Sequence, residues 1–450
     1  MMNRYIKHLR FIPIAASAVL LFLPSCEIDD IADPNNPTIE SVMENATVDD
    51  LNNLVVGTES GMRNVLGTYY DDVGVIGREY YRFSGSDPRF TSDLLGAGSA
   101  VLDNNTFYTT NPWSARYRVV KNTNILIDAV NNTELITETQ RQGYLGFAKT
   151  IKAHQLLMNL TLMNENGIRL DVADPENLGP IVDKPTALAA IAVLLDEAAA
   201  HLQQAGTLFA FSLSGYAAPD DVTGFTGFNN PAGFLKFNRA LAARVAVYRE
   251  NFADALTLLT QSFLELNTNF SRGVYYTFST APGDQLNPLF LPNNATGEIR
   301  IAHPSYVQDI SPGDDRINKV SLRDAPATQS GLTGAYDVAI YTSNTDPIPI
   351  IRNEELILIY AEASIRTNQL TNAVTALNII RAGHNLGPYQ GPVTQAALIN
   401  EMLRQRRFSL YFEGHRWIDM RRYGRLGELP IDRPEDNVWE SFPIPFSENL

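Results

Sequence analysis

Apolar residues recur every three or four positions along much of the chain, which is the spacing of a helix with one buried face. The pattern is clear in residues 141–163 and again in residues 186–204. In the second segment the apolar positions are Leu188, Ile191, Leu195, Ala198 and Leu202. Pro185 precedes this set, and a proline disturbs a helix little at its first turn. From about residue 40 onward, the chain is therefore predicted to be mostly α-helical.

Two segments share a pattern that is typical of a helical hairpin. Residues 239–259 and 357–377 each combine a run rich in small residues, a short polar turn and a second periodic run. Aligned on one another, Ala243 falls on Ala361 and Ala255 falls on Ala373. Small residues let paired helices approach closely. Each segment resembles a tetratricopeptide unit, so we expect a scaffold of tetratricopeptide-like hairpins interrupted by long irregular loop insertions.

The predicted insertions cover residues 71–118, 211–233 and 270–349, and they are rich in Gly, Pro, Asn and aromatic residues. Loops on a rigid scaffold are where binding residues usually lie. The third insertion contains Tyr275, Tyr276, Phe278, Phe290, Tyr306, Tyr336 and Tyr341. The first contains a dense aromatic and charged cluster, made of Tyr80, Tyr81, Arg82, Phe83, Asp87 and Arg89.

This cluster is the predicted ligand-binding surface. Flat rings stack on the apolar face of a sugar or on a peptide side chain, and Arg and Asp supply directional hydrogen bonds. The alternative is that the rings only pack the loop onto the helices. Trp113 is expected to pack in that way, because it leads directly into a helix.

The N-terminus has the pattern of a targeting segment. Residues 1–10 are basic, and the apolar run at residues 11–23 is too short to span a bilayer. The sequence Leu23-Pro24-Ser25-Cys26 follows and resembles a lipobox. Residues 1–25 are thus predicted to be a lipoprotein signal peptide, with acyl chains such as palmitate on Cys26, the single cysteine. The alternative is an ordinary secretion signal with an incidental cysteine.

Residues 26–40 are predicted to form an acidic tether. The cysteine is followed by Glu27, Asp29 and Asp30 and then by Pro and Asn residues, so this segment is predicted to be extended and solvated. Its acidic start resembles the surface-export signal of Bacteroidetes lipoproteins, although a simple polar linker is the alternative. The net charge of −15 repels phosphates, which excludes nucleic acid as a partner.

The most distinctive motifs lie in the last hundred residues. They are IIRNEELILIYAEA at residues 350–363, LNIIRAG at 377–383, RRFSLYFEGHRWIDMRRYG at 406–424 and FPIP at 442–445. This ordered set resembles the SusD/RagB family of nutrient-binding outer-membrane lipoproteins. The resemblance implies a SusD-like domain over residues 41–450, with an N-terminal helical part at 41–265 and a RagB/SusD-type C-terminal part at 266–450. Gln405 and Ser409 stand where the family usually has Glu, so two salt-bridge partners are expected to be missing.

The same motif region offers three metal-ligand residue types, at Glu413, His415 and Asp419. Seven arginines crowd these positions and favour an ion-pair network over a bound cation. They are Arg404, Arg406, Arg407, Arg416, Arg421, Arg422 and Arg425. No metal site and no cofactor are therefore predicted.

The function implied by the resemblance is nutrient binding by a lipid-anchored protein on the outer face of the outer membrane. It would capture an oligosaccharide or peptide and deliver it to a SusC-like TonB-dependent transporter, over which it acts as a lid. No GxSxG, HExxH or phosphate-loop motif is present, and the protein is not expected to be an enzyme. The alternatives are a periplasm-facing helical-repeat scaffold that binds proteins, and a lipid-anchored glycan hydrolase.

Overall fold

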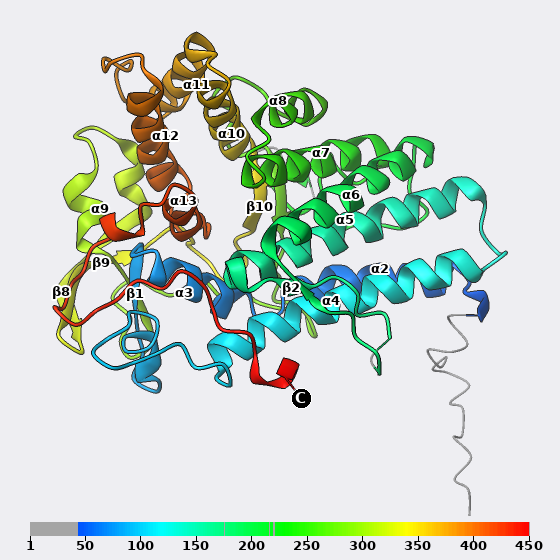
Figure 1. Ribbon diagram of the computed structural model, residues 1–450, viewed down its shortest axis with the longest axis horizontal. Coiled ribbons are helices and arrows are strands. Elements are labelled where there is room, and N and C mark those ends of the chain that lie inside the picture. Colours follow the sequence, from blue (N-terminus) through cyan, green and yellow to red (C-terminus); the bar gives the residue numbers. More distant parts are fainter. Residues whose placement is uncertain (1–43, 175, 216, 219–220, 450) are drawn as a thin grey trace, which may run out of the picture.

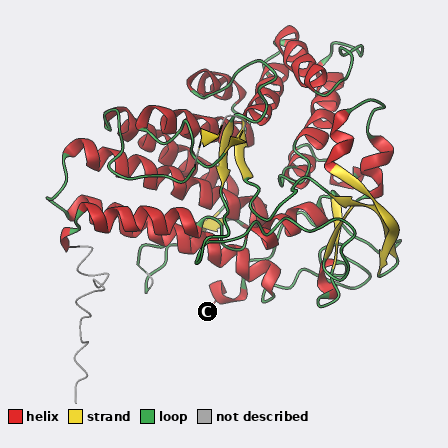
Figure 2. Cartoon of the chain, turned by 180° about the vertical axis from the view of Figure 1, so that it is seen from behind, coloured by secondary structure: helices red, strands yellow, loops and turns green. Residues whose placement is uncertain are grey.

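A computed structural model describes residues 44–174, 176–215, 217–218 and 221–449. The predicted signal peptide, Cys26 and the tether lie outside these residues. Within them, helices predominate and strands are short, so the predicted mostly α class is confirmed (Figures 1 and 2).

The first part of the scaffold is a row of helices that pack in chain order. They are α4 (Phe107–Asn132), α5 (Glu138–Met163), α6 (Lys184–Gln204), α7 (Pro231–Tyr248) and α8 (Phe252–Gln261). Helix α2 (Val48–Gly61) lies along α4 (Figure 1). A capping box starts α5, because the Thr137 hydroxyl accepts from the Gln140 amide and the Gln140 side chain accepts from the Thr137 amide.

Helix α6 is long and apolar enough, by length and composition, to cross a membrane, and it is the only such helix in the described part of the chain. It packs between α5 and α7 along its length. The periodic residues Leu188, Ile191, Leu195, Ala198 and Leu202 are all buried there. Packing within the helical row thus accounts for the apolar residues at these five positions.

The second part of the scaffold is the hairpin of α10 (Asn353–Arg366) and α11 (Leu370–Gly383), followed by α12 (Gln395–Ser409) and the short α13 (Arg416–Arg422). Helix α10 also packs on α7 and α8. The two predicted hairpin segments are therefore α7–α8 and α10–α11, and they lie against one another. Ala243, Ala255, Ala361 and Ala373 are all fully buried, as expected of close helix contacts.

The insertions carry more regular structure than the sequence pattern indicated. The first adds α3 (Leu66–Ile76) and β1 (Tyr80–Phe83), and the third adds α9 (Pro304–Asp309). Strands β1, β7 (Ile299–Ala302), β9 (Leu332–Val338) and β8 (Val320–Gln329) form an antiparallel sheet in that order. A second antiparallel pair joins β6 (Gly273–Tyr276) to β10 (Ile348–Arg352). Apart from the β8–β9 hairpin, these pairings join segments far apart in sequence, which local periodicity does not reveal.

The remaining strands are two short antiparallel pairs. Strand β2 (Ile168–Arg169) pairs with β3 (Ile181–Val182), and β4 (Ala217–Ala218) pairs with β5 (Asp221–Val222).

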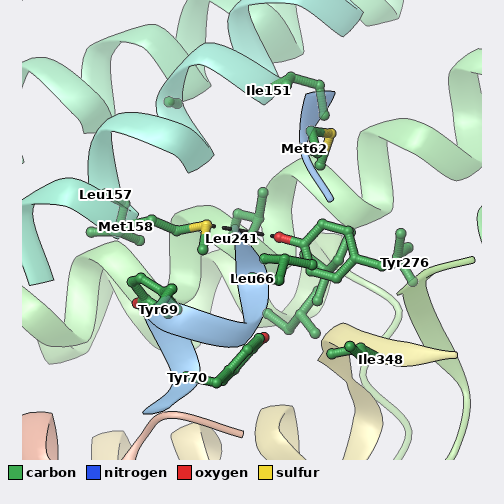
Figure 3. Packing of buried hydrophobic residues seen from close by; sticks show 14 of the residues in the cluster. Met62, Leu66, Tyr69, Tyr70, Ile151, Leu157, Met158, Leu241, Tyr276 and Ile348 are labelled. Carbon is green, nitrogen blue, oxygen red and sulfur yellow. Dashed lines mark hydrogen bonds between the residues drawn. The ribbon is translucent and has the colours of Figure 1, made fainter. Parts of the chain in front are cut away.

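The main hydrophobic core lies where α3, α5, α7 and the β6–β10 pair meet (Figure 3). Leu66, Ile151 and Ile348 are almost fully buried there. The Tyr276 hydroxyl reaches into the core and lies 3.0 Å from Nε2 of His154. This core fixes the β6–β10 pair against the helices and so sets the position of the residues that follow it in sequence.

Candidate functional site

Three of the predicted ligand-binding residues are in the core. Tyr80, Tyr81 and Phe83 on β1 are 1%, 2% and 3% exposed. The Tyr80 ring packs edge-on against Phe412 and its hydroxyl donates to the Tyr70 carbonyl. The expectation that these rings form a surface for stacking is wrong, and the alternative holds: they pack the insertion onto the scaffold. An aromatic strand covered on both faces has the same local composition as an exposed aromatic loop.

The other three predicted residues are closer to solvent but are paired with the protein itself. Arg82 Nη2 lies 2.6 Å from Glu298 Oε2, and Arg89 Nη2 lies 2.6 Å from Asp87 Oδ2. Arg89 also stacks over the Phe107 ring, 4.9 Å from its centre. A ligand-binding role for Arg82, Asp87 and Arg89 stays a prediction.

A different candidate site is a cavity of about 420 Å³ beside the β6–β10 pair. We call it the β10 cavity. Its apolar wall consists of Phe270, Tyr275, Ile340, Tyr341, Pro347 and Pro349. Its polar floor consists of Lys319, Asp346, Arg352, Glu354, His384 and Glu413. Tyr275 and Tyr341 belong to the aromatic residues of the third insertion, but nothing local indicates that Arg352 and His384 join them.

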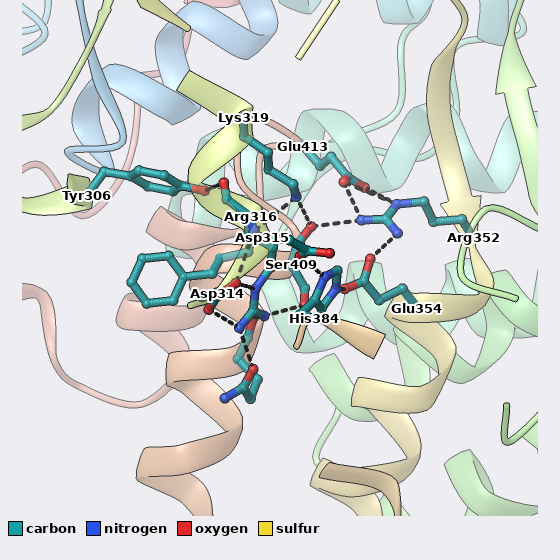
Figure 4. Close-up of polar contacts among 12 residues, drawn as sticks. Tyr306, Asp314, Asp315, Arg316, Lys319, Arg352, Glu354, His384, Ser409 and Glu413 are labelled. Atoms are coloured by element: carbon teal, nitrogen blue, oxygen red, sulfur yellow. Dashed lines mark hydrogen bonds and ion pairs between the residues drawn. The ribbon is translucent and has the colours of Figure 1, made fainter. Parts of the chain in front are cut away.

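Arg352 organises the floor from the end of β10 (Figure 4). Its guanidinium donates to Glu354, to Glu413 Oε1 at 2.7 Å and to the Ser409 carbonyl at 2.7 Å. Burial raises the pKa of Glu354, but Arg352, His384 and Lys319 together outweigh that effect, and the pKa is well below its ordinary value. The Glu354 carboxylate is therefore a fixed negative charge.

His384, at the end of α11, crosses the floor between two carboxylates. Its Nδ1 lies 2.8 Å from Asp315 Oδ1 and its Nε2 lies 2.7 Å from Glu354 Oε1. Phe270 packs on the imidazole at 5.1 Å between ring centres. The Phe270 ring also rests against Gly383, where any Cβ would collide with it. His384 thereby links α10 and α11 to the 3-10 helix η3 (Asp315–Lys319).

Lys319, at the end of η3, is held by backbone rather than by an ion pair. Its Nζ donates to the carbonyls of Phe408 and Ser409 at the C-terminal end of α12. A cation is favourable at that negative end of the helix. Burial nevertheless lowers the pKa of Lys319 to about 8.

The two departures from the family pattern are accommodated by Arg316. Its guanidinium donates to Gln405 Oε1 at 2.8 Å and to Ser409 Oγ at 2.9 Å. The carboxylate comes from Asp314, whose Oδ2 lies 2.6 Å from Arg316 Nη2. The expected loss of salt-bridge partners is thus met by a neighbouring acid, and α12 continues without interruption to Ser409.

The candidate metal ligands take part in the predicted ion-pair network. Asp419 accepts from Arg406 at 2.6 Å and from Arg422 at 3.0 Å, and Glu413 pairs with Arg352. His415 Nε2 lies 3.7 Å from Glu355. Among the described residues, no three His, Cys, Asp or Glu side chains are grouped to hold a metal ion.

The molecule is therefore a scaffold of helical hairpins whose inserted segments build an aromatic-walled cavity. Residues 335–444 match the sequence model of the SusD family. Together with the structural likenesses below, this match confirms, for that segment and for the fold, the resemblance to the SusD family that the C-terminal motifs predicted.

Three solved structures illustrate the likeness. One is a SusD superfamily protein from Bacteroides vulgatus, with a TM-score of 0.66 at 16% identity over 89% of this chain and 96% of the other. Another is described as a putative sugar binding protein from the same organism, with a TM-score of 0.62 at 19% identity over 84% and 87%.

The third structure is surface glycan-binding protein A from Bacteroides thetaiotaomicron, in complex with laminarihexaose. Its TM-score is 0.69 at 14% identity, over 90% of this chain and 97% of the other. At such identities the likenesses establish the fold. No curated protein matches the sequence.

Proposed function

We propose that this protein binds an oligosaccharide in the β10 cavity. The observation that carries the proposal is the pairing of aromatic walls with a fixed polar floor. The half-buried Phe270 ring offers a face for the apolar side of a sugar, Tyr275 and Tyr341 line the wall with 8% exposure each, and the floor offers charged hydrogen-bonding groups. The glycan bound by the Bacteroides thetaiotaomicron relative supports the same ligand class on this fold.

The floor is suited to binding because its side chains are already held. Arg352, Glu354 and His384 are fixed by one another, so a ligand would not have to order them. Lys319 donates two of its three N–H groups to backbone carbonyls and keeps one for a ligand hydroxyl. A peptide is the second ligand class, since the same rings and charges would accept its side chains.

The electrostatics of the floor favour binding without bond cleavage. A glycosidase needs one carboxyl group with a raised pKa to act as general acid. The pKa of Glu354 is shifted in the opposite direction, and Glu413 is engaged by Arg352. These pairings support a binding protein over a lipid-anchored hydrolase.

The proposal extends to where the protein works. Residues 1–25 would be removed, Cys26 would carry the lipid, and the acidic tether would direct residues 41–450 to the outer face of the outer membrane. A SusC-like TonB-dependent transporter would receive the ligand. Labelling cells with a palmitate analogue, with Cys26→Ala as control, tests the anchor. Surface proteolysis of intact cells tests the exterior location, because a protected chain would favour the periplasmic scaffold.

The ligand site is tested by a glycan array and a peptide library on protein lacking residues 1–26. The ligand found is then titrated against Phe270→Ala, which removes a half-buried ring from the cavity wall. Tyr389→Ala, a half-buried ring outside the cavity, is the matched control. We expect at least a tenfold loss of affinity in the first variant only, since stacking on one ring contributes about 1 kcal/mol or more. Equal affinity in both variants would place the ligand elsewhere.

A further inference from the structure

A second cavity of about 290 Å³ lies on the side of α4, away from the β10 cavity, and the two share no lining residue. We call it the α4 cavity. The loop after β2 and the C-terminal 3-10 helix η5 (Phe446–Asn449) close its other sides. Figure 1 shows this end of the chain beside α4.

The floor of the α4 cavity is aromatic and held in place. Trp113 is 3% exposed, and its Nε1 donates to Glu448 Oε1 at 2.8 Å. The Tyr117 ring packs on it edge-on at 4.7 Å between centres, and the Tyr117 hydroxyl donates to the Arg169 carbonyl. Leu178 faces the cavity from the opposite loop and is 42% exposed. An apolar surface of this kind suits the flat face of a ring-shaped ligand.

The rim carries two cations that the protein does not neutralise. Arg118 and Lys121 are exposed on the same face of α4, one helical turn apart. Neither forms an ion pair or a side-chain hydrogen bond with any residue that the structure describes. By contrast, Arg169 in the same cavity pairs with Glu448 at 2.6 Å. Two unpaired cations beside an apolar hollow are notable in a chain of net charge −15, where carboxylates are plentiful.

We propose that the α4 cavity binds an oligosaccharide containing a uronic acid. The sugar carboxylate would lie between Arg118 and Lys121, where a guanidinium matches the two carboxylate oxygens. The sugar ring would rest on Tyr117 and Leu178. This site goes beyond the proposed function, because it selects an acidic glycan through residues that the β10 cavity does not contain.

Calorimetric titration of the purified full-length chain tests the proposal. The probes are α-1,4-linked trigalacturonate and the neutral trisaccharide of galactose with the same linkage. We expect trigalacturonate to bind more tightly, and its affinity to fall as salt is added. The double variant Arg118→Ala/Lys121→Ala is expected to lose at least tenfold in affinity. The matched control, Lys236→Ala/Arg249→Ala, removes two exposed cations, one on α7 and one at its C-cap, and should leave the affinity unchanged.

Several results would overturn the proposal: no binding of trigalacturonate, equal binding of the neutral trisaccharide, or equal affinity in the double variant. If succinate binds as tightly as trigalacturonate, the cavity recognises the carboxylate alone and the sugar ring does not contribute to binding. Phe270→Ala separates the two sites. If it leaves trigalacturonate binding intact, that binding does not depend on the β10 cavity, whether or not a ligand is found there.

Discussion

Nε2 of His384 lies 2.7 Å from Oε1 of Glu354, and this contact joins the end of α11 to the start of α10 across the floor of the β10 cavity. The other ring nitrogen faces Asp315 on η3. One side chain therefore connects the helical hairpin to the insertion that carries β8 and β9. The geometry of the floor and the seating of that insertion depend on the same residue.

Removing this link is expected to weaken both stability and binding. His384→Ala deletes two hydrogen bonds to carboxylates and leaves the buried Glu354 with fewer partners, so unfolding should become easier by about 2 kcal/mol. Ligand affinity in the β10 cavity should fall in parallel. Thermal denaturation and titration check the two effects. His201→Ala, on α6 and far from the floor in sequence, is the control; equal losses in both variants would argue against a special role for His384.

Acid should destabilise the protein strongly below pH 4.5. Burial raises the pKa of Glu355, but Arg244 and His415 lower it more, to about 2. A carboxylate with a depressed pKa contributes stability above its unfolded value, near 4.5, and this stability is lost as pH falls toward the folded value.

Buried His154 acts in the same direction. Burial, with help from Arg244 and Arg116, lowers its pKa to about 3. Its neutral form is favoured in the fold, so stability is lost as pH falls from about 6.5 toward 3. Melting temperatures measured from pH 6.5 to 2.5 should fall with increasing steepness. Arg244→Met/Glu355→Gln, which removes the ion pair as a unit, should flatten the curve below pH 4.5; an unchanged curve would remove that pair from the explanation.

Local periodicity predicted α6 well, because that helix buries one face, whereas α7 and α10 are buried on nearly all sides. The ordered C-terminal motifs predicted the family, and the arginine-rich segment correctly indicated ion pairs at Asp419. Long-range strand pairing was not predictable in the same way. Tyr80–Phe83 became β1 because residues 299–302 pair with it, and nothing near residue 80 encodes that partner.

The candidate site was harder to predict, for a related reason. The β10 cavity takes Tyr275, Tyr341 and Arg352 from one stretch of chain, but His384 comes after two later helices and Glu413 after three. Aromatic density drew attention to the first insertion, where the rings are in fact core residues. Density of rings does not distinguish a binding surface from a covered strand; only the tertiary partners, such as Phe412 above Tyr80, do so.

Tyr81→Ala should therefore act on stability and not on binding. Tyr81 is 2% exposed and packs between Phe83 and His303, at 5.6 Å and 5.2 Å between ring centres. Truncating a buried aromatic ring is expected to cost about 3 kcal/mol of unfolding free energy. Urea denaturation measures that loss. An unchanged denaturation midpoint, with weakened ligand binding, would return Tyr81 to the ligand surface.

The replacement of the family's glutamates by Gln405 and Ser409 predicts a rescue experiment. Arg316 is buried, and Asp314 is its only carboxylate within ion-pairing distance among the described residues. Asp314→Asn should therefore destabilise the fold by about 3 kcal/mol, because a buried guanidinium loses its counter-charge. Adding Gln405→Glu places a carboxylate where Gln405 Oε1 already accepts from Arg316 at 2.8 Å, and should recover most of the loss.

In the wild-type background the same Gln405→Glu should be neutral or destabilising. Gln405 also donates to Glu401, and a carboxylate at position 405 would repel the Glu401 carboxylate. Chemical denaturation of the wild type, the two single variants and the double variant gives the coupling free energy between positions 314 and 405. Additive losses would mean that Asp314 does not replace the missing glutamate.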